Sequence, residues 1–203
     1  MLAVLLTLPT LAMASVTCQD GQSHDTLSAA VADATCSEIA LTPGTYVGDI
    51  QVDRTVSITG EGPVGTFIVS RGSPCLSLDA GADLALSGVT IAGDRTIISA
   101  REAKLRLNNS TVASLSGDGR GLLRLFDTDA WVHGVTFHLA DREALAVDAV
   151  SGRGHDMTFD RVKFLGTLPA PKGMGAVYAL NYGVSCTDCI FGAPAEKLTI
   201  PTI

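Results

Sequence analysis

An eight-residue pattern of alternating apolar side chains recurs five times, and it constrains the fold more than any other feature of this sequence. The repeats, here called octets, are Leu84–Ile91, Leu105–Val112, Ala130–Phe137, Met157–Phe164 and Val184–Phe191. Successive octets begin about 21 to 27 residues apart, and a period of this size in an alternating pattern is typical of a solenoid.

Each octet changes the phase of its alternation at position five. Positions one and three are apolar, as the two inward side chains of a short strand should be. Positions six and eight are mostly apolar again, which an uninterrupted strand cannot produce. Position five is held by Gly88, Asn109, Gly134, Arg161 and Asp188. Because glycine and asparagine tolerate a left-handed backbone, we expect a corner of one residue between two short strands.

A third short strand is expected before each octet. The segments 76–78, 98–100, 123–125, 145–147 and, less regularly, 176–178 carry the matching apolar residues. Three strands per coil, stacked on neighbouring coils, would form parallel sheets around a filled core. The sequence therefore predicts an all-β parallel β-helix of about five to six coils over residues 38–203, with residues 38–62 forming the opening coil.

The first 37 residues carry two further signals. Residues 1–14 combine a short apolar run with Ala12-Met13-Ala14, which is typical of a cleaved signal peptide and predicts a secreted, periplasmic or cell-surface protein. Residues 15–37 contain a short helical pattern with Leu27, Ala30, Val31 and Ala34 at helical spacing. We expect this helix to cap the open end of the sheet stack and a Cys18–Cys36 disulfide to hold it.

The segments Pro43-Gly44-Thr45-Tyr46 and Val56–Gly62, together with the octets, resemble the pectin-lyase-like superfamily of right-handed parallel β-helices. The resemblance covers roughly residues 38–191. It implies a right-handed solenoid but no single activity, because this fold carries unrelated functions. The superfamily includes pectate lyases, pectinesterases, polygalacturonases, phage tailspikes and bacterial adhesins.

Polar residues outside the octets suggest one site that the superfamily uses, the outer face of the first strand of each coil. Asp79, Arg101, Arg124 and Asp148 should point outward there. They would either bind a uronic-acid polymer, with calcium if the protein is a lyase and with an arginine as base, or pair as solvated ladders between coils. Together with His155 they are the candidate catalytic residues. His155 lies in the longest insertion, residues 149–156, which is expected to be a loop. The superfamily's enzyme motifs are absent or broken, since Gly154-His155-Asp156 differs from the Gly-His-Gly of polygalacturonases.

The remaining signals concern binding. Trp131 should face solvent beside Arg106, either as a platform for a sugar ring or as a stacking pair within the sheet. Cys186 and Cys189 should point inward as core thiols or a short disulfide, and neither they nor any other group predicts a metal site. A net charge of −7 argues against nucleic acid, and no segment is long and apolar enough to span a membrane.

We therefore predict a noncatalytic secreted or surface module that binds a polysaccharide or a surface protein, or acts as a spacer. The alternative is a small polysaccharide lyase or hydrolase acting on uronic-acid polymers. No cofactor is predicted, calcium being required only if the protein is a lyase.

Overall fold

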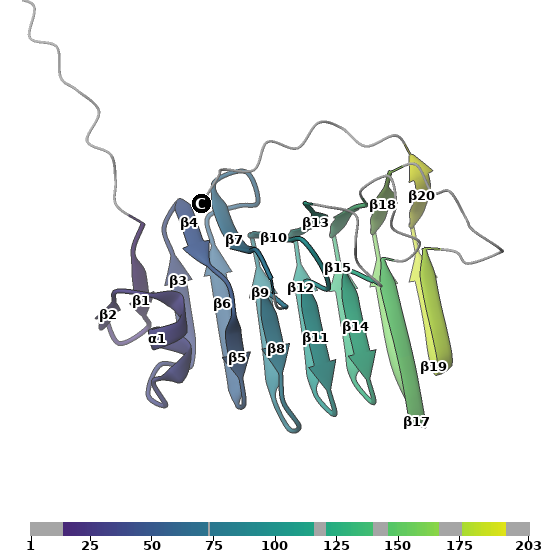
Figure 1. Ribbon diagram of the computed structural model, residues 1–203, viewed down its shortest axis with the longest axis horizontal. Helices are drawn as coiled ribbons and strands as arrows, with labels where there is room; N and C mark the ends of the chain where they lie inside the picture. Colours follow the sequence, from purple (N-terminus) through teal and green to yellow (C-terminus); the bar gives the residue numbers. More distant parts are fainter. Residues whose placement is uncertain (1–13, 73, 116–120, 140–145, 167–175, 194–203) are drawn as a thin grey trace, which may run out of the picture.

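The computed structural model describes residues 14–72, 74–115, 121–139, 146–166 and 176–193, so most of the predicted signal peptide lies outside the described residues. The described chain forms a parallel β-solenoid of about five turns (Figure 1). The predicted all-β parallel solenoid is therefore confirmed. Successive coils stack along the long axis of the molecule, so residues about one repeat apart in the sequence become neighbours across a sheet.

The strands form three parallel strips along the solenoid, here called faces one, two and three, and each complete coil contributes one strand to each face. Face one contains β5 (Ile50–Val52), β8 (Leu76–Leu78), β11 (Ile98–Arg101), β14 (Leu123–Phe126) and the first halves of β17 (Val147–Asp160) and β19 (Val177–Thr187). Face two contains β3 (Glu38–Leu41), β6 (Thr55–Gly60), β9 (Asp83–Ser87), β12 (Lys104–Asn108), β15 (Asp129–His133) and the second halves of β17 and β19. Face three contains β4 (Gly44–Val47), β7 (Thr66–Ser70), β10 (Thr90–Gly93), β13 (Thr111–Ser114), β16 (Thr136–His138), β18 (Lys163–Leu165) and β20 (Ile190–Ala193).

The octets set the register of faces two and three. Their first residues pair in one row across face two, in the order Leu84, Leu105, Ala130, Met157 and Val184. The fifth residues form the corner between faces two and three, and all of them have a left-handed backbone: Gly88 (φ 65°), Asn109 (φ 43°), Gly134 (φ 61°), Arg161 (φ 52°) and Asp188 (φ 51°). The predicted one-residue corner is therefore confirmed in every octet.

The core is a set of apolar columns that run along the solenoid. In one column the ring of Phe164 stacks between those of Phe137 and Phe191, with centroids 5.1 and 4.8 Å apart. Phe137 and Phe164 are fully buried, whereas Phe191 is 53% exposed. Burial of an inward side chain therefore requires a coil on each side of it.

The N-terminal segment packs against the first coil. β1 (Val16–Cys18) pairs antiparallel with both β2 (Ser23–His24) and β3, and the helix α1 (Leu27–Ala32) contacts β1, β2 and β5. Thr26 begins the helix, because its hydroxyl accepts a hydrogen bond from the Ala29 N–H at 3.1 Å. The helix ends sooner than expected, since Asp33 is extended and its carboxylate accepts a bond from the Thr35 N–H, which leaves Ala34 exposed beyond the helix.

One expectation about local structure is wrong, and the alternatives left open for Cys186 and Cys189 are decided by the structure. Residues 149–156 are not a loop, because they lie within β17, which bends with a register shift between Val150 and His155. Of the two alternatives for Cys186 and Cys189, the short disulfide is the one found. Cys186 pairs in register with the buried Phe159, but it is exposed because no further described coil covers it. Cys186 and Cys189 are paired with each other across the corner residue Asp188, and Cys18 is paired with Cys36.

Candidate functional site

The predicted row of charged residues lies on face one, and each member contacts a neighbouring coil. The Arg124 guanidinium lies 4.0 Å from the Asp148 carboxylate, its direct register partner. Asp79 accepts a hydrogen bond from the Gln51 amide at 2.7 Å. Arg101 lies over the ring of Phe126, 5.9 Å from its centroid. The row therefore forms separate contacts between coils instead of converging on one site.

A cleft of about 450 Å³ lies where the coils turn from face one into face two. Its polar lining comes from several coils and consists of Thr55, Asp83, Glu102, Lys104, Asp127, Asp129, Arg153 and His155. Of the five candidate catalytic residues named from the sequence, His155 alone lines this cleft. The cleft therefore brings together polar groups of different kinds from several coils.

The corner beneath this cleft was missed in the sequence. Glu102 and Asp127 have left-handed backbones, with φ of 50° and 45°, so they turn the chain as the octet corners do. A signal was available, because an acidic residue directly follows both β11 and β14. Such a corner aims its side chains outward, which is why two carboxylates from successive coils reach one cleft.

His155 is held in this cleft by a carboxylate from the neighbouring coil. Its Nδ1 lies 2.9 Å from Asp129 Oδ1, which also accepts a bond from the Asp156 N–H at 3.2 Å. Because an ionised carboxylate only accepts hydrogen bonds, this pair favours the tautomer with the proton on Nδ1. The ring of Tyr182 lies 6.2 Å from the His155 ring, and its hydroxyl accepts a bond from the Thr128 N–H. The imidazole is therefore oriented by the Asp129 carboxylate of one neighbouring coil and lies beside the Tyr182 ring of the next.

Asp127 serves as an acceptor in the bend of β17. It accepts bonds from the Ser151 hydroxyl at 2.8 Å and from the Gly152 N–H at 2.7 Å. These two bonds, the Ser151 bond first, hold the pKa of the Asp127 carboxyl below its usual range. Asp127 is consequently ionised at neutral pH and is a poor proton donor.

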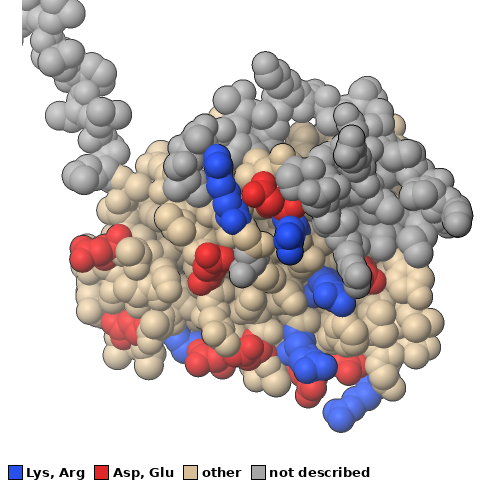
Figure 2. Space-filling model, in the orientation of Figure 1, with Lys and Arg blue, Asp and Glu red and all other residues tan. Residues whose placement is uncertain are grey.

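The charges of the cleft are unbalanced. Four carboxylates, those of Asp83, Glu102, Asp127 and Asp129, line it together with Lys104, Arg153 and His155. Figure 2 shows acidic and basic side chains interspersed on the side of the molecule that it presents, without a continuous patch of one sign. The excess of negative charge in the cleft would repel a polyanion but would not repel a neutral or basic ligand.

Trp131 lies on face two, further along the strand than the cleft residue Asp129, and is not itself part of the cleft lining. It lies two residues after Asp129 on β15, so both side chains leave the same side of the strand. The indole is 40% exposed and pairs in register with Arg106 on one side and Thr158 on the other. The Arg106 guanidinium lies 5.9 Å from the indole centroid and donates a bond to Asp83 at 2.8 Å. Arg106 thus connects the exposed ring to the carboxylates of the cleft.

Comparisons with known proteins identify no relative. The chain matches no protein-family model, no curated protein and no solved structure. Among the described residues there is no helix with the length and apolar character needed to cross a membrane. A proposal about function must therefore rest on the geometry of this surface.

Proposed function

We propose that this solenoid is a carbohydrate-binding module whose binding surface is the cleft together with the exposed ring of Trp131. The single observation that carries the proposal is the position of Trp131, an exposed indole on the same side of face two as the polar cleft. An aromatic ring can stack on the apolar face of a sugar, while carboxylates and an imidazole beside it accept and donate bonds to hydroxyl groups.

The charge of the cleft indicates which carbohydrate to expect. Because carboxylates outnumber cationic side chains there, a neutral or amino-sugar polymer should bind better than a polyuronate. Arg106 does not reverse this preference, since its guanidinium is already paired with Asp83. A uronic-acid ligand would require a bridging cation such as calcium.

Binding to a panel of neutral, amino-sugar and uronic-acid polysaccharides, measured by calorimetry with and without calcium, tests this proposal. Trp131→Ala should weaken binding of the preferred polymer by roughly tenfold, because an aromatic contact contributes about 1 to 1.5 kcal/mol. The matched control is Phe126→Ala. Phe126 is 38% exposed and also lies beneath an arginine, but it belongs to face one.

Two outcomes would contradict the binding surface. Wild-type affinity in Trp131→Ala would remove the ring from the site. An equal loss in both variants would indicate a general effect on the solenoid and not a contact with sugar. A preference for polyuronates in the absence of calcium would contradict the argument from charge.

A second candidate function is favoured by the His155–Asp129 pair. A histidine oriented by a carboxylate can move a proton, so we propose a small polysaccharide lyase or hydrolase as the alternative. Release of reducing ends by the same samples would support this alternative if His155→Ala abolished it. The double variant Arg124→Ala with Asp148→Ala should retain such activity, because the two residues pair with each other and do not line the cleft.

We also propose that the chain is a right-handed member of the pectin-lyase-like superfamily and that it is exported. The three-face coil with left-handed corners supports the first proposal, and the Cys18–Cys36 pair supports the second. Both are consistent with a module that meets polysaccharide outside the cytoplasm.

A further inference from the structure

Three potential metal ligands meet beside helix α1, away from the cleft and from the proposed carbohydrate surface. Cys18 ends β1, His24 ends β2 and Cys36 follows the helix. The two sulfur atoms and one ring nitrogen of His24 all lie within 4.8 Å of one another. The sequence did not suggest this cluster, because the separation of the residues along the chain does not show that the antiparallel β1–β2 pair and the helix close on the same point.

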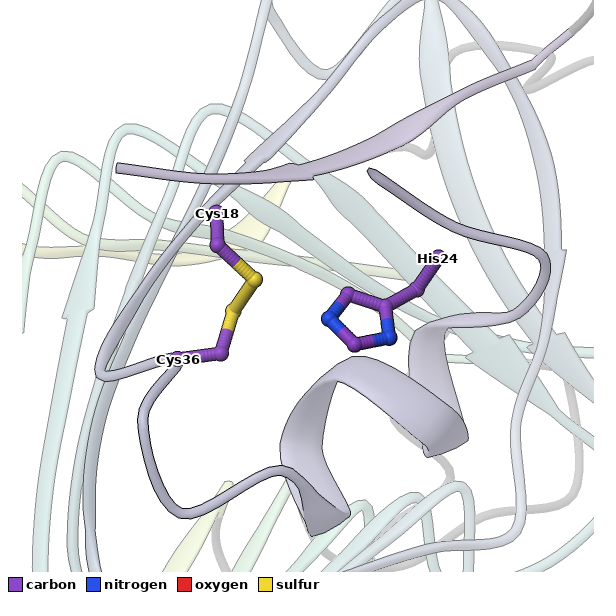
Figure 3. A group of neighbouring side chains, drawn as sticks. All are labelled: Cys18, His24 and Cys36. Atoms are coloured by element: carbon purple, nitrogen blue, oxygen red, sulfur yellow. A yellow bond between two sulfur atoms is a disulfide. The ribbon is translucent and has the colours of Figure 1, made fainter. Parts of the chain in front are cut away.

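The surroundings of the cluster are almost closed to solvent. Cys18 is 3% exposed, Cys36 is 1% exposed, and the His24 side chain is 12% exposed. Figure 3 shows the edge of the His24 ring turned toward the paired sulfur atoms. An ion held at this point would therefore be bound by buried side chains and largely shielded from solvent.

One atom of the cluster lacks the hydrogen bond that its burial requires. Nε2 of His24 is buried and has no hydrogen-bond partner among the described residues. Its one ion pair among the described residues is the longer contact with Asp33, with Nε2 and Oδ2 3.5 Å apart. A buried polar atom without a hydrogen bond is costly, and a metal ion is one way to satisfy an imidazole nitrogen.

We propose that the chain binds one zinc ion here when the Cys18–Cys36 disulfide is reduced. The ligands are the sulfur atoms of Cys18 and Cys36 and Nε2 of His24, with water or Asp33 completing a tetrahedral site. A dithiol supplies the two electrons and two protons that open the disulfide and itself becomes a cyclic disulfide. Each cysteine thiol then releases one proton as its thiolate binds the ion.

The geometry needs only side-chain adjustment to form this site. Zinc–sulfur and zinc–nitrogen bonds of about 2.3 and 2.0 Å in a tetrahedron place neighbouring ligand atoms about 3.5 to 3.8 Å apart. The present arrangement spans up to 4.8 Å, and the sulfur atoms separate once their bond is broken. Zinc would then replace the disulfide as the tie between β1 and the end of α1, so the segment stays anchored in both redox states.

Metal titration of the reduced and the oxidised protein tests this site. The titration uses the variant with Cys186→Ser and Cys189→Ser, because these changes remove the other closely spaced cysteine pair. After anaerobic reduction and removal of the dithiol, Co²⁺ is added as a spectroscopic probe and then displaced with Zn²⁺. We expect one equivalent per chain, with sulfur-to-cobalt charge-transfer absorption, and no such absorption in the oxidised protein.

Two variants separate this site from chance binding. His24→Gln should weaken cobalt binding at least about tenfold, yet in the oxidised form it should remain folded because the disulfide does not depend on the imidazole. Cys75→Ala, which removes the buried free thiol, should leave the affinity unchanged. Equal binding before and after reduction, wild-type affinity in His24→Gln, or loss of binding in Cys75→Ala would overturn the proposal.

Discussion

The corner between faces two and three turns at a single residue in each coil, and its chemistry varies while its backbone does not. Gly88 and Gly134 adopt the left-handed conformation at little cost, and Asn109 tolerates it. Arg161 and Asp188 adopt it as well, although a side chain with a Cβ atom is strained there. The stacked coils impose this geometry through backbone bonds such as that from the Gly134 N–H to the Asp160 carbonyl.

Reciprocal substitutions at this corner should change stability in opposite directions. Gly134→Ala should lower the free energy of unfolding by about 1 to 2 kcal/mol. Alanine would have to adopt the left-handed backbone, and its Cβ would lie 2.6 Å from Asn109 Oδ1. Arg161→Gly should raise it by about 0.5 to 1 kcal/mol, since the strain removed exceeds the entropy that glycine adds to the unfolded chain. The lost ion pair with Asp160 is exposed and adds little.

Urea unfolding of the two variants beside the wild type provides the measurement. A less stable Arg161→Gly variant would mean that the contacts of the arginine with Asp160 and His133 outweigh backbone strain.

At the scale of the element, Arg54 attaches helix α1 to the solenoid. Its guanidinium donates to the carbonyls of Val31 and Cys36 at 2.9 and 2.8 Å, and also to that of Asp33. These carbonyls lie at and beyond the end of the helix, where no further helical turn supplies donors. One side chain on the first coil thus satisfies the end of the N-terminal helix.

Removing this guanidinium should loosen the helix more than the solenoid. Arg54→Ala should reduce the free energy of unfolding by about 2 to 3 kcal/mol, because it leaves several carbonyls without a charged donor. Arg54→Lys should recover only part of this loss, since one ammonium group cannot reproduce the planar fork. Hydrogen exchange should accelerate in residues 15–36 and stay near wild type in β9 and β12. A uniform acceleration along the chain would contradict this view of Arg54.

At the scale of the molecule, the two ends of the described solenoid differ. At the N-terminal end, β1 pairs with β3 and α1 contacts β5 of the first coil. The last described coil exposes large apolar side chains, among them Leu180, Val184, Ile190 and Phe191. In a solenoid each coil is stabilised mainly by its immediate neighbours, so these apolar groups contribute less here than their counterparts in inner coils.

Hydrogen exchange along face two should therefore be graded. Amides in the second half of β19 should exchange faster than those of β12 by on the order of tenfold or more, because β12 has described coils on both sides. The comparison is controlled, since both segments lie on the same face and belong to octets. Equal protection of β12 and β19 would show that the end coil is stabilised by contacts other than those of stacked coils.

The sequence alone determined the repeat, the inward and outward alternation, and the one-residue corners and strand register of the octets. It could do so because these features are local: side chains alternate along a strand, and left-handed turns favour a few residue types. The pairing of Leu84 with Leu105 and Ala130 follows from aligning the octets. The same alternation predicts from which side of face two the indole of Trp131 projects.

Only the tertiary structure decided which polar and metal-binding side chains lie together. The cleft depends on the bend of β17, which brings His155 to Asp129 of the preceding coil, and a bulge of that kind cannot be placed from periodicity. The exposure of Cys186 depends on which coils lie beside it, and the meeting of His24 with two cysteines depends on the closure of β1 against the helix. These are contacts between separate segments, and their geometry is set by packing in three dimensions rather than by any local preference of the chain.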